Sequence, residues 1–213
     1  MISIAIPVYI QSKKEITMLK RLIDSIMSQT YKDIEIVISD NTQGELGLKV
    51  EELVKRYKKI RYFYNERHGA SANTNSAIMA CNCDVIKIMY QDDYFTDKDA
   101  LKEIIESFKG HWLINGCSDN LTPIITGDLH KGNNKLGSPS CLTIRKESFL
   151  PFDESLKWLF DCEMYKRMLD TYGEPKIMIG DYVTIGIGEH QATNKLSDEL
   201  KRKEVVELSL KYK

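Results

Sequence analysis

Two adjacent aspartates, Asp92 and Asp93, follow an apolar run at residues 84–90, with only Gln91 between. Neighbouring carboxylates at the end of a buried strand repel each other and lose hydration unless a cation or a hydrogen-bond network compensates them. Their oxygen atoms suit Mg²⁺ or Mn²⁺, which commonly bind through one or two carboxylates together with substrate phosphates. The pair is therefore a candidate metal site, and a hydrogen-bonded pair without metal is the alternative.

Polar residues also follow the other apolar runs of the first half. The run at residues 34–40 ends on Asp40, and the run at 60–64 leads into a polar segment at 65–69. Ligands of parallel α/β sheets bind at the carboxyl ends of the strands, so Asp40 should share one edge with Asp92 and Asp93. A turn or helix-cap role explains Asp40 equally well.

The elements that would position these residues alternate between short β-rich runs and helical patterns. Such alternation is typical of βαβ units on a parallel sheet. The apolar residues of the first helical pattern recur at intervals of three and four, which predicts one buried face. Strands are expected at residues 2–8, 34–40, 60–64 and 84–90, and helices at 15–29, 48–57 and 71–80.

The second half is less regular. Its polar stretch at residues 117–138 contains Pro123 and three glycines, and long loops of this kind are commonly functional or disordered. We favour a loop that frames an acceptor site over an insertion without a functional role. The other expected elements are helices at 97–108 and 156–171, strands at 141–145, 176–179 and 182–187, and a charged amphipathic helix at 197–211.

Composition limits the class of protein. The chain has 213 residues, 42% hydrophobic and 29% charged, with a net charge of -1, which predicts one globular domain without a strong nucleic-acid signature. No window approaches the roughly 18 apolar residues of a transmembrane segment, and the start is typical of a strand rather than a signal peptide. The five cysteines favour reduced buried thiols over disulfides, and over a metal site at Cys81 and Cys83. We therefore expect a cytoplasmic protein.

Four ordered motifs resemble the inverting glycosyltransferase family 2. They are IAIPVYIQSKKEITMLKRLIDSIMSQTYKDIEIVISDN, HGASANTNSAI, YQDDYF and WLFDCEMYKRM. The resemblance implies the GT-A (nucleotide-diphospho-sugar transferase) fold, an α/β fold with a Rossmann-like, mostly parallel central sheet flanked by helices and a small acceptor-side extension. It implies one domain over residues 1–213, with a nucleotide-sugar-binding half at 1–96 and an acceptor and catalytic half at 97–213.

The resemblance also implies roles for residues of the first half. Asp40 would accept a hydrogen bond from the base of a uridine donor, Asp92 would touch the ribose, and Asp93 would coordinate the metal that bridges the diphosphate. Thr74 stands where the family often has a basic residue, so Arg67 or His68 would supply that contact. The remaining nucleotide-sugar-binding residues implied are Pro7, Val8, Tyr9, Gly69, Ser71 and Asn75.

In the second half, placing Arg167 on the arginine of the family's E-D-x-D-L-x-x-R segment puts Asp161 on the catalytic base. Glu163 then falls on the second acid, whereas Phe160 replaces the first glutamate. An amphipathic helix with exposed acids is the alternative reading. His190 is implied as a further metal ligand, with an ordinary surface histidine as the alternative.

The function that these motifs imply is metal-dependent, inverting transfer of a sugar from a UDP-sugar, or another nucleotide diphosphate sugar, to a carbohydrate or other hydroxyl acceptor. The expected cofactor is Mn²⁺ or Mg²⁺. A non-catalytic nucleotide-sugar-binding module of the same fold is the main alternative. A sugar-phosphate nucleotidyltransferase is less favoured because no glycine-rich loop follows the first strand, and an NAD-dependent oxidoreductase because G-x-G-x-x-G is absent from the sequence.

Overall fold

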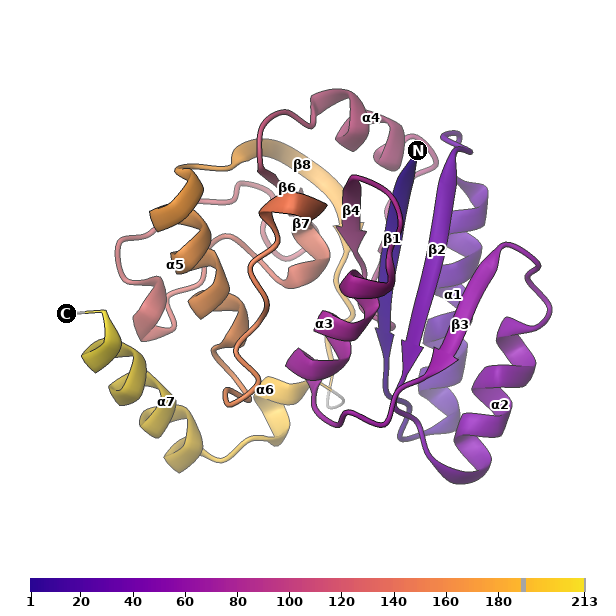
Figure 1. Cartoon of the computed structure of the whole chain (residues 1–213), viewed down its shortest axis with the longest axis horizontal. Coiled ribbons are helices and arrows are strands. Elements are labelled where there is room, and N and C mark those ends of the chain that lie inside the picture. The colour runs from indigo at the N-terminus through magenta and orange to yellow at the C-terminus, as the bar shows by residue number, and fades with distance from the viewer. Residues whose placement is uncertain (189–190, 213) are drawn as a thin grey trace.

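The computed structural model describes residues 1–188 and 191–212, which form one mixed eight-stranded sheet with helices packed against it (Figure 1). The strand order is β3-β2-β1-β4-β7-β6-β8-β5. The strands are β1 (Ile2–Val8), β2 (Ile34–Asp40), β3 (Ile60–Tyr64), β4 (Val85–Ile88), β5 (Tyr94–Phe95), β6 (Trp112–Cys117), β7 (Leu142–Arg145) and β8 (Lys176–Thr184). The helices are α1 (Lys13–Ser28), α2 (Gly44–Val54), α3 (Ala70–Ala80), α4 (Ala100–Ser107), α5 (Phe160–Tyr172), α6 (Ala192–Lys195) and α7 (Asp198–Lys211), with 3₁₀ turns η1 (Leu129–Lys131), η2 (Pro139–Cys141) and η3 (Lys146–Ser148).

The first four strands are parallel, as predicted. Every residue of β1 is buried, which explains its nearly continuous apolar sequence. The register between β1 and β2 runs from Ile2 opposite Ile34 to Val8 opposite Asp40, so both strands end at the same edge of the sheet. In Figure 1, α1 and α2 cover one face of this part of the sheet and α3 covers the other.

The second half inserts an antiparallel strand into the sheet. β7 lies between β4 and β6 and is antiparallel to both, whereas β6 and β8 are parallel. The predicted strands at 176–179 and 182–187 are one strand, β8, which passes through Gly180 at a positive φ of 134°. The polar stretch that begins at Cys117 is mainly loop, as expected, and its one regular element is the short turn η1.

Two predicted helices differ from those observed. The helix expected from residue 156 begins at Phe160, because the Glu204 carboxylate accepts hydrogen bonds from the backbone N–H groups of residues 157–159 and holds them in another conformation. α7 forms as predicted, but its apolar residues do not gather on one face, and its two buried residues are Glu204 and Leu208. No helix in the described chain combines the length and apolarity that a membrane crossing requires.

Candidate active site

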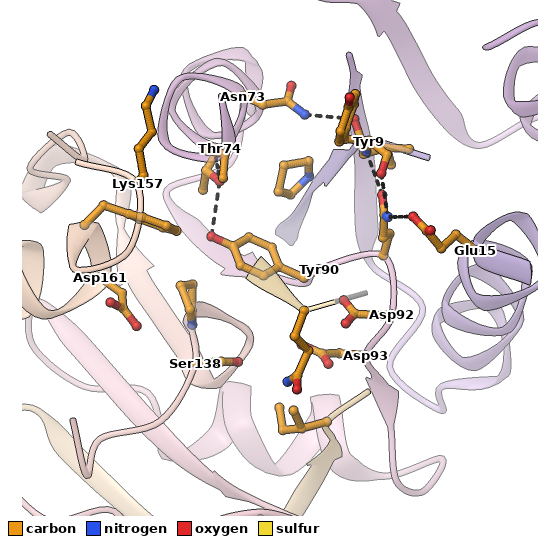
Figure 2. Close-up of a pocket in the computed structure, with 18 of the residues that line it drawn as sticks. Tyr9, Glu15, Asn73, Thr74, Tyr90, Asp92, Asp93, Ser138, Lys157 and Asp161 are labelled. Carbon is orange, nitrogen blue, oxygen red and sulfur yellow. Dashed lines mark hydrogen bonds between the residues drawn. The ribbon is translucent and has the colours of Figure 1, made fainter. Parts of the chain in front are cut away.

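A pocket of about 290 Å³ opens where β1 and β4 end. Six of the residues predicted to act in a site line it, namely Pro7, Val8, Tyr9, Asp92, Asp93 and Asp161. Figure 2 shows Asp161 and Lys157 on one side of the pocket, with Asp92, Asp93 and Glu15 on the other. The fold therefore joins residues from both halves of the sequence at one cavity, as the edge of a parallel sheet predicts.

Asp93 is the more deeply buried of the paired aspartates, with 3% of its surface exposed. Its Oδ1 accepts a hydrogen bond from the Gly186 backbone N–H at 2.8 Å. Burial, with a further contribution from the Asp92 carboxylate, raises the pKa of Asp93 to about 7. A side chain at Gly186 would collide with Asp92, since a Cβ there would lie 2.5 Å from the Asp92 carbonyl oxygen. This close approach explains the glycine.

The pair fits a divalent cation. Burial and the neighbouring carboxylate raise the pKa of Asp93, so a bound cation would stabilise its ionised form beyond what the Gly186 N–H supplies. The described residues contain no group of three or more candidate metal ligands, so substrate phosphates would have to complete the coordination. His190, the other predicted ligand, lies outside the described residues.

Gln91 fixes the end of β1 beside this pair. Its side chain accepts a hydrogen bond from the Tyr9 N–H at 2.6 Å and donates one to the Tyr9 carbonyl at 2.8 Å. The same amide donates to Glu15, a buried carboxylate in the first turn of α1. Tyr9 itself is 52% exposed. The first residue of the Q-D-D motif thus holds the backbone of the expected nucleotide pocket, a role that the sequence analysis did not assign.

Asp161 occupies the first turn of α5 and faces the pocket. Its carboxylate accepts hydrogen bonds from its neighbour, the Cys162 N–H, at 2.7 Å and from Asn134 Nδ2 at 3.0 Å. Burial raises the pKa of Asp161 to about 6, against the effect of these donors. Asn134 belongs to the long polar loop, so that loop contributes directly to the site.

Asp40 does not line the pocket. The residue is fully buried, and its two oxygens accept hydrogen bonds from the Thr42 N–H at 2.8 Å and from the Tyr62 hydroxyl at 3.0 Å. Burial raises the pKa of Asp40, while these donors oppose the rise. In this arrangement Asp40 stabilises the end of β2 in the turn role named as the alternative, and its contact with a base stays a prediction.

The predicted nucleotide-sugar-binding residues in and just before α3 lie outside the pocket, and the contacts described for them are with other parts of the protein. Gly69 precedes the helix with a positive φ of 109°, and Ser71 is buried in the first turn. Asn75 exchanges hydrogen bonds with the Phe152 backbone, donating to its carbonyl at 2.9 Å and accepting from its N–H at 2.8 Å. Arg67 is paired with Glu154 at the surface. None of these four lines the pocket, so their contact with a nucleotide sugar stays a prediction.

Glu163 has a structural role. The residue is fully buried, and its carboxylate accepts hydrogen bonds from Arg167 Nε at 2.9 Å, Lys211 Nζ at 2.7 Å and the Tyr212 hydroxyl at 2.8 Å. Burial raises the pKa of Glu163, but these donors outweigh it and the net pKa is lowered. The alternative of an exposed acid is therefore wrong at this position, because Glu163 anchors the end of α7 to α5.

Lys157 and Trp158 also line the pocket, and the sequence analysis gave neither of them a role. Both immediately precede the LFDCE segment, and this position next to Asp161 is the sequence feature that could have indicated them. Trp158 is half-buried and lines the same pocket as Asp161. The site therefore combines a carboxylate pair, a separate carboxylate with a raised pKa, one lysine and exposed aromatic surface.

Comparisons with known proteins agree with this geometry. The model of the family described as Glycosyl transferase family 2 matches residues 3–146. An uncharacterized glycosyltransferase of Rickettsia conorii is 33% identical over 100 residues, which is 46% of this chain and 16% of that protein. The chain spans between 15 and 33% of the length of the first curated relatives that it matches.

Solved structures share the fold at low sequence identity. Staphylococcus aureus TarS in complex with UDP superposes with a TM-score of 0.68 at 16% identity, over 98% of this chain and 70% of that one. Mannosyltransferase PcManGT from Pyrobaculum calidifontis, in complex with GDP-Man and Mn²⁺, gives 0.67 at 13% identity, over 99% and 63%. With the GT-A fold in common and the family model matching most of the sequence, the chain belongs to glycosyl transferase family 2.

Proposed function

We propose that the chain transfers a sugar from a nucleotide diphosphate donor, UDP-linked in the first instance, to an acceptor hydroxyl with inversion at the anomeric carbon. The observation that carries this proposal is the pairing of Asp92 and Asp93 with Asp161 across one pocket. The Asp92 and Asp93 pair is suited to holding a cation, and the Asp161 carboxylate is suited to accepting a proton. Family membership and the nucleotide complexes of TarS and PcManGT support the donor class.

The donor would lie along the end of β1, where Pro7, Val8 and Tyr9 line the pocket and the half-exposed Tyr9 offers an aromatic ring to a nucleoside. Mn²⁺ or Mg²⁺ held by Asp93 would neutralise the charge that develops on the departing diphosphate. The Gly186 N–H and the burial of Asp93 keep that carboxylate in one orientation. Water reaches it poorly, which strengthens its electrostatic interactions.

Asp161 would take the proton of the acceptor hydroxyl as that oxygen attacks. With a pKa of about 6 it is a stronger base than an ordinary aspartate and is still mainly ionised at neutral pH. Direct attack with one general base needs no covalent sugar intermediate, which is the basis for proposing inversion. Trp158 beside Asp161 would supply an apolar face to the ring of a carbohydrate acceptor.

Isothermal titration of UDP, GDP and dTDP, with and without Mn²⁺, tests the donor site. Wild type and Asp93→Ala are compared, with Asp84→Ala as the control because Asp84 is an exposed aspartate at the opposite end of β4. The expected result is Mn²⁺-dependent binding of UDP that Asp93→Ala loses and Asp84→Ala keeps. Absence of binding of UDP, GDP and dTDP to the wild type under both conditions would overturn the proposal.

A second measurement separates the transferase from the non-catalytic module. UDP-sugars that bind are incubated with wild type and Asp161→Asn, and release of UDP is followed. Turnover that depends on Asp161 supports a transferase. Donor binding with no turnover above the rate of the Asp161→Asn variant favours the nucleotide-sugar-binding module, in which Phe160 in place of the family's glutamate would mark the lost activity.

A further inference from the structure

Charge is unevenly distributed around the pocket. Its described lining includes four carboxylates, those of Glu15, Asp92, Asp93 and Asp161, and a single basic side chain, that of Lys157. A nucleoside diphosphate brings further negative charge into this cavity. A divalent cation on the aspartate pair offsets part of that charge from one wall only, so the position of the one lysine bears directly on how the diphosphate is held.

The Lys157 ammonium lies beside the first turn of α3. A Cβ built on Gly69 would be 3.7 Å from Lys157 Nζ. Thr74, at the position where the family often has a basic residue, lines the same pocket and donates its hydroxyl hydrogen bond to the Ala70 carbonyl. Lys157 thus brings a positive charge to α3 from a segment more than 80 residues away in the sequence.

Arg67, two residues before Gly69, is already paired with an acid. The Arg67 guanidinium binds both carboxylate oxygens of Glu154, at the surface. In contrast, within residues 1–188 and 191–212 no carboxylate forms an ion pair with Lys157. A lysine at a pocket wall without an internal partner has its hydrogen-bond donors available for a ligand.

The segment that carries Lys157 is held at both ends. Glu204 of α7 is 4% exposed, and its carboxylate accepts hydrogen bonds from three successive backbone N–H groups, at 2.6 Å from Lys157, 3.0 Å from Trp158 and 2.9 Å from Leu159. Asn75 of α3 holds the other end through Phe152. Both sets of hydrogen bonds involve backbone groups. They therefore fix the backbone position of Lys157 and do not involve its ammonium group.

We propose that Lys157 binds the diphosphate of the donor from the wall opposite Asp93, and that Glu204 is the positioning residue that sets its place. This inference rests on the proposed function, since it assigns a second contact to the same donor. In this arrangement the diphosphate is held between a cation on the aspartate pair and the Lys157 ammonium. The charge that the family often places on α3 is supplied here by the segment before α5.

The test compares the affinities of UDP and uridine, in Mn²⁺, for wild type and Lys157→Met. Loss of one charge-assisted hydrogen bond should weaken UDP about tenfold and leave uridine unchanged, because uridine has no phosphate. Lys157→Arg should recover most of the affinity for UDP. Lys203→Met is the matched control, since Lys203 is an exposed lysine on α7 whose partner is Glu207.

The outcomes separate the two proposals. Wild type that binds no UDP would overturn the proposed function, and this inference with it. Wild type that binds UDP while Lys157→Met binds it equally well would overturn this inference alone. An equal loss of UDP and uridine affinity would also overturn it, because the lysine would then be acting on the shape of the pocket rather than on the phosphates.

Glu204 is tested by coupling to Lys157. Glu204→Gln should weaken UDP without changing uridine, and the double variant with Lys157→Met should bind UDP no more weakly than Lys157→Met alone. Glu207→Gln on the same helix is the control, and thermal unfolding checks that each variant is folded. Additive losses in the double variant would show that Glu204 acts independently of Lys157 and would overturn the positioning role.

Discussion

The two halves of the molecule hold their site residues by different means. In residues 1–96, site residues follow parallel strands, and the register of β1 with β2 and β4 brings them to one edge. In residues 97–212, Asp161 and Lys157 depend on single polar side chains from distant segments, namely Asn134, Asn75 and Glu204. A repeated backbone pattern tolerates the loss of one side chain, whereas a clamp made by one side chain does not. Loss of one clamping side chain should therefore displace Asp161 or Lys157 more than loss of one strand side chain displaces the residues at the sheet edge.

The largest effect is expected for Asp161→Asn. An amide cannot take the proton of the acceptor, so turnover of a bound UDP-sugar should fall by about 10²–10⁴ while UDP affinity stays within about twofold. UDP release and isothermal titration measure the two quantities. Asp170→Asn is the control, because Asp170 is a half-exposed aspartate on the same helix, ion-paired with Lys166. Wild-type turnover in Asp161→Asn would remove this residue from the mechanism.

Asn75→Ala should have the next largest effect, on stability. It breaks both hydrogen bonds to the Phe152 backbone and leaves a buried N–H and carbonyl unsatisfied, so the free energy of unfolding should drop by about 2–4 kcal/mol. Urea unfolding measures it. Ser76→Ala, also on α3, removes only a hydrogen bond to its own helix and should cost less than about 1 kcal/mol. Equal losses in the two variants would contradict the view that Asn75 is a specific clamp.

A smaller effect concerns pH. Because the pKa of Asp161 is about 6 and the base must be ionised, turnover in saturating Mn²⁺ should be level above that pH and fall as the pH drops through it. Asn134→Ala removes a donor that favours the ionised form, so the fall should begin at higher pH. Asn133→Ala is the neighbouring control, since Asn133 donates to Asp128 instead. An unchanged profile in Asn134→Ala would show that the loop does not tune this base.

The smallest effect is expected for Arg67→Met. Its ion pair with Glu154 lies at the surface, with the two side chains 53% and 39% exposed, so the free energy of unfolding should change by less than about 1 kcal/mol. Arg56→Met, which breaks an exposed pair with Glu52, provides the comparison. If Arg67→Met instead weakens UDP severalfold, the nucleotide contact predicted from the sequence is supported.

Residues 1–96 were largely predictable because periodicity and strand ends carry local information. The four parallel strands were placed to within a few residues, and Tyr9, Asp92 and Asp93 were brought to one pocket as expected. Asp40 shows the limit of that reasoning. A strand end predicts the edge of the sheet but not whether the side chain faces the pocket or, as here, bonds to Thr42 and Tyr62.

The second half was less predictable because its contacts join segments far apart in the sequence. No local pattern indicates that Glu204 would meet the backbone before α5, or that Asn134 would meet Asp161. The single strand β8, which passes through Gly180, was predicted as two. The resemblance singled out Asp161 through its spacing from Arg167, which periodicity alone could not have done; Asp161 lines the pocket, and its role as a base stays a prediction.

The clamp by Glu204 also has a consequence for the order of synthesis. Glu204 follows Leu159 by 45 residues, so the ribosome completes the segment around Asp161 well before the carboxylate that fixes it exists. The parallel strands can assemble during that interval, because their partners are all made earlier. The nascent chain would therefore form the sheet edge that carries Asp92 and Asp93 first, and the segment before Asp161 would be fixed only when α7 emerges.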